Sequence, residues 1–509
     1  MRCLLQPFIG GLVIFLLGTS LALAQTTVEG LGLDFSFADD VPQLGIDGEK
    51  KPKDSWLSKF SFDGYFKSET AYRFREPRSF TKVRNILYLN AKYPVNDAID
   101  LNFAGWAYHD LAYDLFSYDT VAARIERNSD EPPVFVERLP KDKDSPVVAI
   151  RELYVDFVRD KLEMRLGKQY IIWGVLEGVR VVDELNPMDF REMILPDLID
   201  YRIPLWSLKL DYYSDIADFQ LVWIPDVQFH KPAPRGSEWE LLQNVCADQP
   251  VEIICLETTP DRFSLQDSEF GLRVSKRLFD AEFSLSYFYT WDDFPVIFRT
   301  VRLPVDDTHL PAFFPVYTRM SMYGGTVVKQ FDSIIAKMEF AYVTDKYFGV
   351  RNTTDSDQDG YLDFDGELKR DHLRVGLGLE FNLWNTDISP GITQWTIYKH
   401  DAAIIQDRND VAINLFVRKE FPAWAATFQM LAIRLVNLKE LLLKPKMTFQ
   451  MDDHLQVATG LDLFFGERSD FGVNSALLSG TFDPNRVRAQ FFGNFYDNDR
   501  AYLEFKYSF

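Results

Sequence analysis

An acidic stretch has the residue types and spacing of a calcium-binding loop. It reads Asp355-Ser-Asp-Gln-Asp-Gly-Tyr-Leu-Asp-Phe-Asp365. Carboxylates at alternate positions can converge on one hard cation, Gly360 permits a sharp turn, and Tyr361 can offer its carbonyl oxygen. We therefore predict a structural Ca²⁺ site, with the following ligands: Asp355, Asp357, Asp359, Tyr361, Asp363 and Asp365.

This loop departs from an EF-hand in two respects. Its twelfth position is Gly366, with Glu367 one place late, and the flanking sequences read as strands rather than helices. The alternative is an acidic, solvated loop without a metal.

Two cysteines lie close together in a long loop at 226–266. Cys246 and Cys255 are the only cysteines after the N-terminal leader, and no histidine lies between them. In an oxidising compartment such a pair is expected to form a disulfide, whereas a metal site would need further ligands.

Catalytic patterns are scarce. The six histidines are scattered, and the chain has neither a His-Glu-x-x-His zinc pattern nor a Gly-x-Ser-x-Gly nucleophile elbow. Gly376-Leu-Gly378 lies within an alternating strand rather than in a nucleotide-binding loop. We predict that the protein is not an enzyme; a hydrolase whose residues assemble from distant strands is the alternative.

The C-terminal residues 501–509 indicate the elements that must position these groups. Phe505, Tyr507 and Phe509 fall on one side of a strand, while Glu504 and Lys506 fall on the other. The pattern resembles the closing strand of bacterial outer-membrane β-barrels, whose terminal aromatic residue is read by the barrel assembly machinery. The resemblance implies that Phe505, Tyr507 and Phe509 form the assembly signal; an edge strand of a soluble sandwich is the alternative.

The N-terminus predicts export. Arg2 precedes an apolar run over 8–21, and Ala22-Leu-Ala24 supplies small residues before a cleavage point. We predict a signal peptide over 1–24, a polar periplasmic segment over 25–58 and a β-barrel over 59–509.

Composition agrees with this organisation. Aromatic residues make up 15% of the chain, including 43 Phe and 23 Tyr, and the formal net charge is −21. Transmembrane barrels place aromatic residues in two girdles, and their alternating strands keep mean hydropathy low. The negative charge excludes nucleic acid as a partner, because phosphates require a basic surface.

Turn-forming residues divide the chain into alternating strands. Short turns such as Arg159-Asp160, Asp280 and Asp452-Asp453 all fall at one end of the strands. The long segments 111–147, 171–203, 226–266, 291–314 and 345–369 all fall at the other. This asymmetry predicts an all-β, antiparallel up-and-down transmembrane barrel of about 18–20 strands in the Gram-negative outer membrane, with short periplasmic turns and long extracellular loops. The count depends on 466–495, which reads either as two strands of the wall (471–482 and 485–495) or as one long loop with a single hairpin.

The segment 162–205 carries a second resemblance. It contains Arg165-Leu-Gly-Lys-Gln169, Trp173-Gly174 and Asn186-Pro-Met-Asp-Phe-Arg191. This "RLGKQ–WG–NP-D-R" run is similar to that of a widespread, largely uncharacterised family of proteobacterial outer-membrane barrels, distantly similar to alginate-export barrels. The resemblance implies a porin-like barrel whose solutes include hydrophobic or lipid-derived compounds.

The same segment reads as a loop folded into the lumen. Asn186 can cap a short helix with Pro187 at its first position, and Pro196 would end it. The loop mixes apolar bulk with charge, and irregular backbone is tolerated at membrane depth where it lines a cavity. We predict a pore constriction, with a loop packed on the barrel rim as the alternative; the candidate lining residues are Arg180, Asp183, Asp189 and Arg191.

Further charges are expected along the lumen, because they alternate with apolar positions. They are Arg84, Glu163, Arg165, Glu269, Arg273, Arg374 and Glu380. With both signs present, we expect a porin or facilitated-diffusion channel for a small solute. A barrel that sheathes a partner protein is the alternative. Membrane lipid and lipopolysaccharide are the other expected partners.

Overall fold

The computed structural model describes most of the chain. The described residues are 59–76, 78–115, 147–233, 238–239, 254–255, 258–305, 308–350, 367–466 and 491–509.

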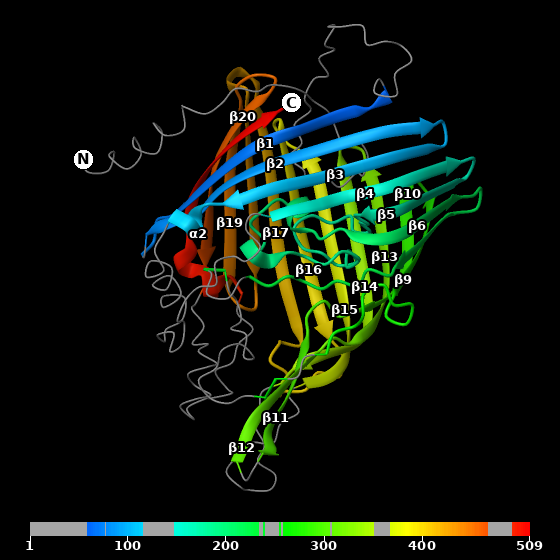
Figure 1. Cartoon of the computed structure of the whole chain (residues 1–509), viewed down its shortest axis with the longest axis vertical. Helices are drawn as coiled ribbons and strands as arrows, with labels where there is room; N and C mark the ends of the chain where they lie inside the picture. Colours follow the sequence, from blue (N-terminus) through cyan, green and yellow to red (C-terminus); the bar gives the residue numbers. More distant parts are fainter. Residues whose placement is uncertain are drawn as a thin grey trace.

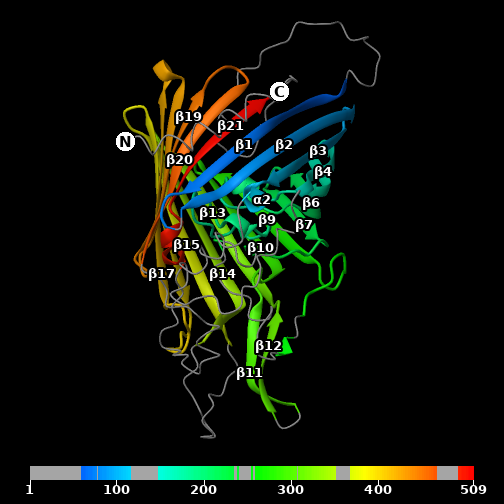
Figure 2. The same cartoon turned by 60° about the vertical axis from the view of Figure 1, so that its left-hand side comes forward.

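Eighteen strands form one closed antiparallel barrel, the lower count that the sequence predicts (Figure 1). Each strand pairs with its neighbours along the chain, and β21 pairs with both β20 and β1, which closes the wall (Figure 2). The strands are β1 (Ser61–Arg73), β2 (Ser79–Asn96), β3 (Ile99–Asp110), β4 (Val147–Arg159), β5 (Leu162–Gln169), β6 (Leu205–Tyr213), β7 (Asp218–Ile224), β9 (Glu269–Leu278), β10 (Ala281–Trp291), β13 (Arg319–Phe331), β14 (Ile334–Gly349), β15 (Glu367–Asn382), β16 (Thr386–Ile397), β17 (Asn409–Phe421), β18 (Ala426–Leu435), β19 (Glu440–Gln450), β20 (Leu455–Phe465) and β21 (Arg500–Ser508).

Side-chain alternation gives this wall an apolar outer face and a polar inner face. In β15, Leu377 and Leu379 are 50% and 43% exposed on the outer face, whereas Arg374 and Gly376 point inward. A period of two places consecutive residues on opposite faces, so one strand serves both environments. The alternation of side chains predicted for this strand is confirmed.

Tight turns join the strands at one end of the barrel. Phe279 and Asp280 both have positive φ, 53° and 57°, as do Trp384 and Asn385, 52° and 54°. Two consecutive residues of this kind form the primed turns whose twist matches that of the flanking strands. The long connections all lie at the other end, as the sequence predicts.

One long connection contains structure that the sequence reading missed. Residues 291–314 were expected to form a loop, but β11 (Val296–Val305) and β12 (Thr308–Val316) form a hairpin there. The hairpin extends away from the barrel (Figures 1 and 2), and β12 pairs in parallel with β8 (Ile254–Cys255). The prolines at 304, 311 and 315 weaken the strand signal, because proline cannot donate to a ladder.

The predicted strand 485–495 is wrong where the structure describes it. Residues Phe492–Asn498 form a 3₁₀ helix, η5, in which Phe492 and Phe495 pack on Phe464 and Trp239. The carboxylate of Glu440 accepts the backbone N–H groups of residues 491–493. These tertiary contacts replace a strand ladder. The predicted strand 471–482 lies outside the described residues.

Helices are short in the described part of the chain. They include α2 (Ala112–Leu115), η2 (Phe190–Glu192), α4 (Leu198–Tyr201) and η3 (Pro422–Trp424). None of the helices found there is long and apolar enough to cross a membrane.

Candidate functional site

The connection between β5 and β6, residues 170–204, contacts inward-facing side chains from several parts of the barrel wall. We call it the inward segment, with an apolar half (170–186) and a charged half (187–204). The apolar half bonds to β14 and β15, and the charged half bonds to β2, β19 and β21. Strands from well-separated parts of the eighteen-strand ring therefore meet on one loop.

A single carboxylate anchors the apolar half. Glu339 on β14 accepts the backbone N–H groups of Val175, of Leu176 at 2.6 Å and of Val182 at 3.1 Å. Glu339 is 1% exposed. A buried carboxylate is stable only when it is well bonded, and an irregular segment needs acceptors for its N–H groups, so each satisfies the other.

Apolar packing completes this anchor. Trp173, Val181, Val182 and Leu185 are buried with residues of β7, β10, β13 and β14. The Trp173 ring lies edge-on to Phe288 at 6.0 Å, and its indole N–H donates to Gln220 at 2.6 Å. These contacts explain why a loop at this position carries so many apolar residues.

Glycines on the wall make room for the segment. A Cβ on Gly376 of β15 would lie 2.3 Å from the Leu176 side chain, and one on Gly271 of β9 would lie 2.7 Å from the Trp173 ring. The Gly376-Leu-Gly378 pattern therefore serves close approach of the inward segment.

An ion pair ends the apolar half. Glu184 bonds to Arg374 of β15 at 2.6 Å, and Arg374 also contacts His372 at 2.9 Å. Burial alone would raise the pKa of Glu184, but the charges of Arg374 and Arg180 lower it to about 2. The carboxylate stays ionised in its buried position.

The local structure around Asn186 differs from the prediction. Asn186 does not cap a helix: its side chain accepts the N–H of Ile171 at 2.8 Å and donates to the carbonyl of Ile203 at 2.8 Å. It thus ties together the two ends of the inward segment. The 3₁₀ helix η2 begins later, with Asp189 as its N-cap, and α4 follows Pro196.

Glu192 is the centre of the charged half. Its carboxylate meets Lys82 at 2.7 Å, Arg84 at closer range and Arg500 at 3.8 Å. Burial would raise the pKa of Glu192, but these three cations, with Arg84 first, lower it to about 2. One acid from the segment therefore bridges β2 and β21.

Other cations of the wall bond to backbone carbonyls of the charged half. Lys444 of β19 donates to the carbonyl of Leu195 at 2.6 Å. Arg151 of β4 donates to the carbonyls of Ile199, at 2.7 Å, and Arg202, at 2.9 Å. The wall holds this half by charge, and Met193 and Leu195 also pack in an apolar cluster with Ile433, Leu442 and Phe464.

A polar cavity of about 70 Å³ remains beside the charged half. Acids and bases line it together with the rings of Trp106 and Tyr108. The charged lining residues are Glu69, Lys82, Arg84, Asp110, Asp189, Arg191, Glu192 and Asp200. This cavity is the candidate site for a solute.

The four predicted constriction residues separate into two pairs. Asp189 and Arg191 bond to each other at 2.6 Å and line the polar cavity. Asp183 is buried against Arg202 at 2.6 Å, and Arg180 donates to the carbonyl of Asp183 at 2.9 Å. The second pair holds the shape of the segment and does not line this cavity.

The predicted lumen residues are distributed in the same way. Arg84 lines the cavity, and Arg374 holds Glu184. The others lie apart from the cavity, in local contacts: Arg165 with Asp156 at 2.6 Å, Glu163 with the Tyr213 hydroxyl at 3.2 Å, Glu380 with Lys337, and Glu269 with Thr290 and the Trp291 N–H. Arg273 is half-buried, and its Nε has no hydrogen-bond partner among the described residues.

Sequence reasoning missed Glu339, Lys82, Lys444 and Arg500. Alternation places each of them on an inner face, and that signal was available. Which of these side chains would meet the inward segment depends on the fold of the segment.

The predicted calcium ligands Asp355, Asp357, Asp359, Tyr361, Asp363 and Asp365 lie outside the described residues, as does Cys246. Only the backbone of Cys255, in β8, is described. Both the calcium site and the disulfide stay predictions. Within the described ranges, no group of three His, Cys, Asp or Glu side chains could hold a metal ion.

The C-terminal aromatic residues lie at the seam of the barrel. Phe509 exchanges backbone hydrogen bonds with Gly64 at 2.9 and 3.1 Å, and its ring lies 6.3 Å from that of Phe62. Phe505 is 38% exposed, and Tyr507 stacks on His454. Their role as an assembly signal stays a prediction.

The chain matches the model of one protein family. A family model described as "Protein of unknown function (DUF1302)" matches residues 80–396. The chain belongs to this family. The match includes the run at 162–205, and the similarity to alginate-export barrels stays a prediction. No curated protein sequence matches the chain.

Several solved barrels are similar at low sequence identity. OccAB3 of Acinetobacter baumannii is 10% identical, with a TM-score of 0.45, over 89% of this chain and 99% of that one. OccK9 (OpdG) of Pseudomonas aeruginosa is 10% identical, with a TM-score of 0.46, over 89% and 99%. OmpT of Vibrio cholerae is 11% identical, with a TM-score of 0.37, over 88% and 99%.

Proposed function

We propose that this protein is an outer-membrane channel for a small solute, narrowed by the inward segment. The closed wall supports this, because a barrel of this size encloses an aqueous lumen unless something fills it. The apolar outer face fits a bilayer, and the charged inner face fits water.

The inward segment carries the proposal. It bonds to β2 and β21 through Glu192 and to β14 through the N–H groups that Glu339 accepts. A loop tied to both regions spans the lumen, so a solute has to pass beside it. The polar cavity beside the charged half is the proposed path.

The lining of that cavity supports a polar solute without a strong preference for either sign. Arg84 pairs with Asp110 at 3.5 Å, and Arg191 pairs with Asp189 at 2.6 Å. Paired charges of both signs select by size and by the arrangement of hydrogen-bonding groups. The rings of Trp106, Tyr108 and Trp239 also line the cavity and offer apolar surface to a solute.

We place the protein in the Gram-negative outer membrane, exported through the predicted leader at 1–24, with the long connections outside. The proposed partners are membrane lipid, lipopolysaccharide and the barrel assembly machinery. Among the proposed roles for the cavity, catalysis has no specific support, so we propose a channel without enzymatic activity.

Planar-bilayer recording of the full-length protein tests this function. Folding is checked first by a β-type circular dichroism spectrum and by a mobility change on boiling. We expect small, steady channels that candidate polar solutes block. Folded protein that never conducts would contradict the proposal and favour the scaffold that sheathes a partner protein.

A further inference from the structure

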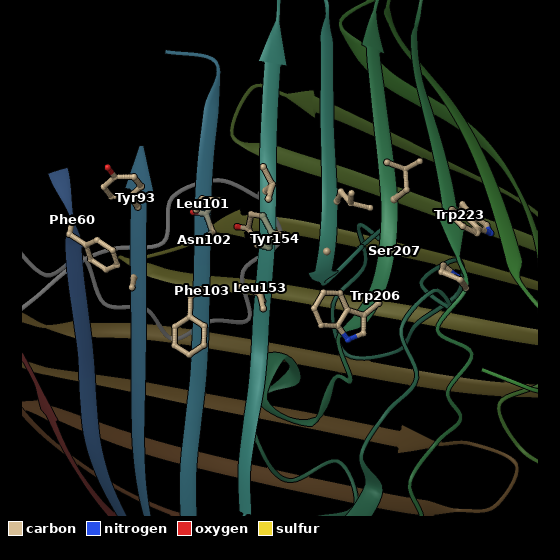
Figure 3. A pocket seen from close by; sticks show the side chains of 16 residues that line it. Phe60, Tyr93, Leu101, Asn102, Phe103, Leu153, Tyr154, Trp206, Ser207 and Trp223 are labelled. Carbon is tan, nitrogen blue, oxygen red and sulfur yellow. The ribbon is translucent and has the colours of Figure 1, made fainter. Parts of the chain in front are cut away.

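The outer face of the wall is hollowed over β2–β7. A cavity of about 710 Å³ lies there, far larger than the polar cavity inside the barrel. Figure 3 shows Phe60 and Tyr93 toward one end and Trp223 toward the other, with Trp206 between them. Its lining includes six large apolar and aromatic side chains: Tyr93, Phe103, Leu153, Leu166, Trp206 and Trp223. We call it the outer groove.

The register of the strands shows which face the groove occupies. Tyr93 pairs with Leu101, which pairs with Val155, which in turn pairs with Leu166. Directly paired residues share a face of the sheet. Leu101 and Leu166 are 42% and 53% exposed, so this row lies on the outer face.

A small residue between aromatic ones explains the hollow. Ala91 stands between Phe62 and Phe103 on the same face, where its neighbours are large. Further along the groove, Gly167 of β5 leaves the wall thin, because its φ of 142° and a Cβ 2.2 Å from the Leu153 carbonyl exclude a side chain. Large aromatic rings around the small residues Ala91 and Gly167 therefore leave a groove.

The lining defines the class of ligand. None of the lining residues is charged, and most are apolar or aromatic. The volume lies within the range of small-molecule sites, about 300–1,000 Å³. Since this face meets the bilayer under the proposed function, the occupant is an acyl chain.

Two cations stand at one end of the groove. Lys168 pairs with Leu153 and with Trp206, both lining residues, so its side chain lies on the outer face. Arg262 bonds to the buried Asp226 at 2.5 Å while 54% of its side chain stays exposed. Asp226 in turn accepts the N–H of Trp206 at 3.2 Å, which places Arg262 near the same end.

We propose that the outer groove binds one acyl chain of a lipopolysaccharide molecule, with Lys168 and Arg262 contacting its phosphate. This rests on the proposed membrane location. Lys168 ends β5 at the side of the long connections, which face outward in such barrels, and the outer leaflet is where a phosphorylated, multiply acylated lipid is found. Charge-assisted contacts to a phosphate add to burial of the chain.

Lipid retention after purification tests this. Full-length protein is extracted in mild detergent and washed, and bound lipopolysaccharide and phospholipid are quantified per barrel. We expect about one lipopolysaccharide per barrel in the unmodified protein. Lys168→Gln with Arg262→Gln should lower retention about tenfold, the effect of losing a contact to a charged group. Ala91→Phe, which fills the groove, should also release the lipid.

Two matched variants serve as controls. Ala432→Phe enlarges an alanine on the outer face of β18. Lys276→Gln removes an exposed lysine of β9 at the end of the barrel with the tight turns, away from Lys168. Both should retain the lipid as the unmodified protein does. All variants are checked for mobility change on boiling, so that a folding failure is recognised, and the charge variant keeps the test open if Ala91→Phe does not fold.

Equal retention in all variants would overturn the proposal, as would bound phospholipid without lipopolysaccharide. So would a change of oligomeric state in Ala91→Phe with no loss of lipid, which would make the groove a subunit interface. Conductance is recorded in parallel. Channels without bound lipid would sink this inference alone, whereas bound lipid without channels would sink only the proposed function.

Discussion

The two halves of the inward segment are held in different ways. The apolar half packs in a buried cluster and gives its N–H groups to one carboxylate, Glu339. The charged half has ion pairs and cation-to-carbonyl bonds, and the polar cavity lies against it. Apolar burial is not screened by salt, while charge pairing next to water is. The apolar half thus holds the segment against the wall, and the charged half lines the proposed path of the solute.

Removing the anchor of the apolar half should have the largest effect of a single substitution. Glu339→Ala leaves two buried N–H groups and one half-buried N–H group without an acceptor, which costs about 3 kcal/mol or more. We expect the segment to become susceptible to limited proteolysis in detergent and the channel current to fluctuate. Glu163→Ala is the control, because within the described ranges the carboxylate of half-buried Glu163 accepts a hydrogen bond from the Tyr213 hydroxyl and from no backbone N–H group. A steady current and a protease-resistant inward segment in Glu339→Ala would show that apolar packing alone holds this half.

A charge change in the other half should alter selectivity with less effect on stability. Glu192→Gln removes one negative charge among Lys82, Arg84 and Arg500, while Lys444 and Arg151 still hold the backbone. The reversal potential in a salt gradient should move toward anion preference. Glu420→Gln, on an exposed part of β17, should leave it unchanged. An unchanged reversal potential in Glu192→Gln would separate the cavity from the conduction path.

The smallest effect concerns pH. Burial, with a hydrogen bond to Glu380, raises the pKa of Glu177 in the apolar half from 4.5 to about 8. The inward segment therefore binds this proton more tightly when it is packed against the wall than when it is detached from the wall. The free energy that stabilises the segment against the wall should fall as the pH rises from about 4.5 to about 8 and then level off.

Current fluctuations measured at pH 5, 7 and 9 follow this change. They should increase over that range in the unmodified protein and stay constant in Glu177→Gln, which remains neutral and can still donate to Glu380. The same pH response in both proteins would assign it to another group.

The wall was predictable from sequence, because short turns and period-two alternation are local signals. They indicated about 18–20 strands, of which the structure has eighteen, and the side of the long connections. The hairpin β11–β12 was not predicted, since its prolines argue against strands and its pairing partner β8 is remote in sequence. The helix η5 was missed for a similar reason: Glu440 supplies acceptors from a distant strand.

The site was predictable only in outline. The mixture of apolar and charged residues at 171–203 indicated a loop inside the barrel. The role of each residue depended on tertiary contacts: Asn186 resembles a helix cap but ties Ile171 to Ile203, and Asp183 resembles a lining residue but neutralises Arg202. Local propensity cannot reveal a partner that the fold brings near.

Single-channel conductance after a deletion tests the central claim most directly. Removing residues 175–198 takes out most of the inward segment, and removing 296–316 takes out a hairpin that lies away from the barrel. Both proteins are recorded in the same salt after their folding has been confirmed. We expect a large rise in conductance for the first deletion and none for the second. Unchanged conductance in a folded 175–198 deletion would contradict the claim that this segment narrows the pore.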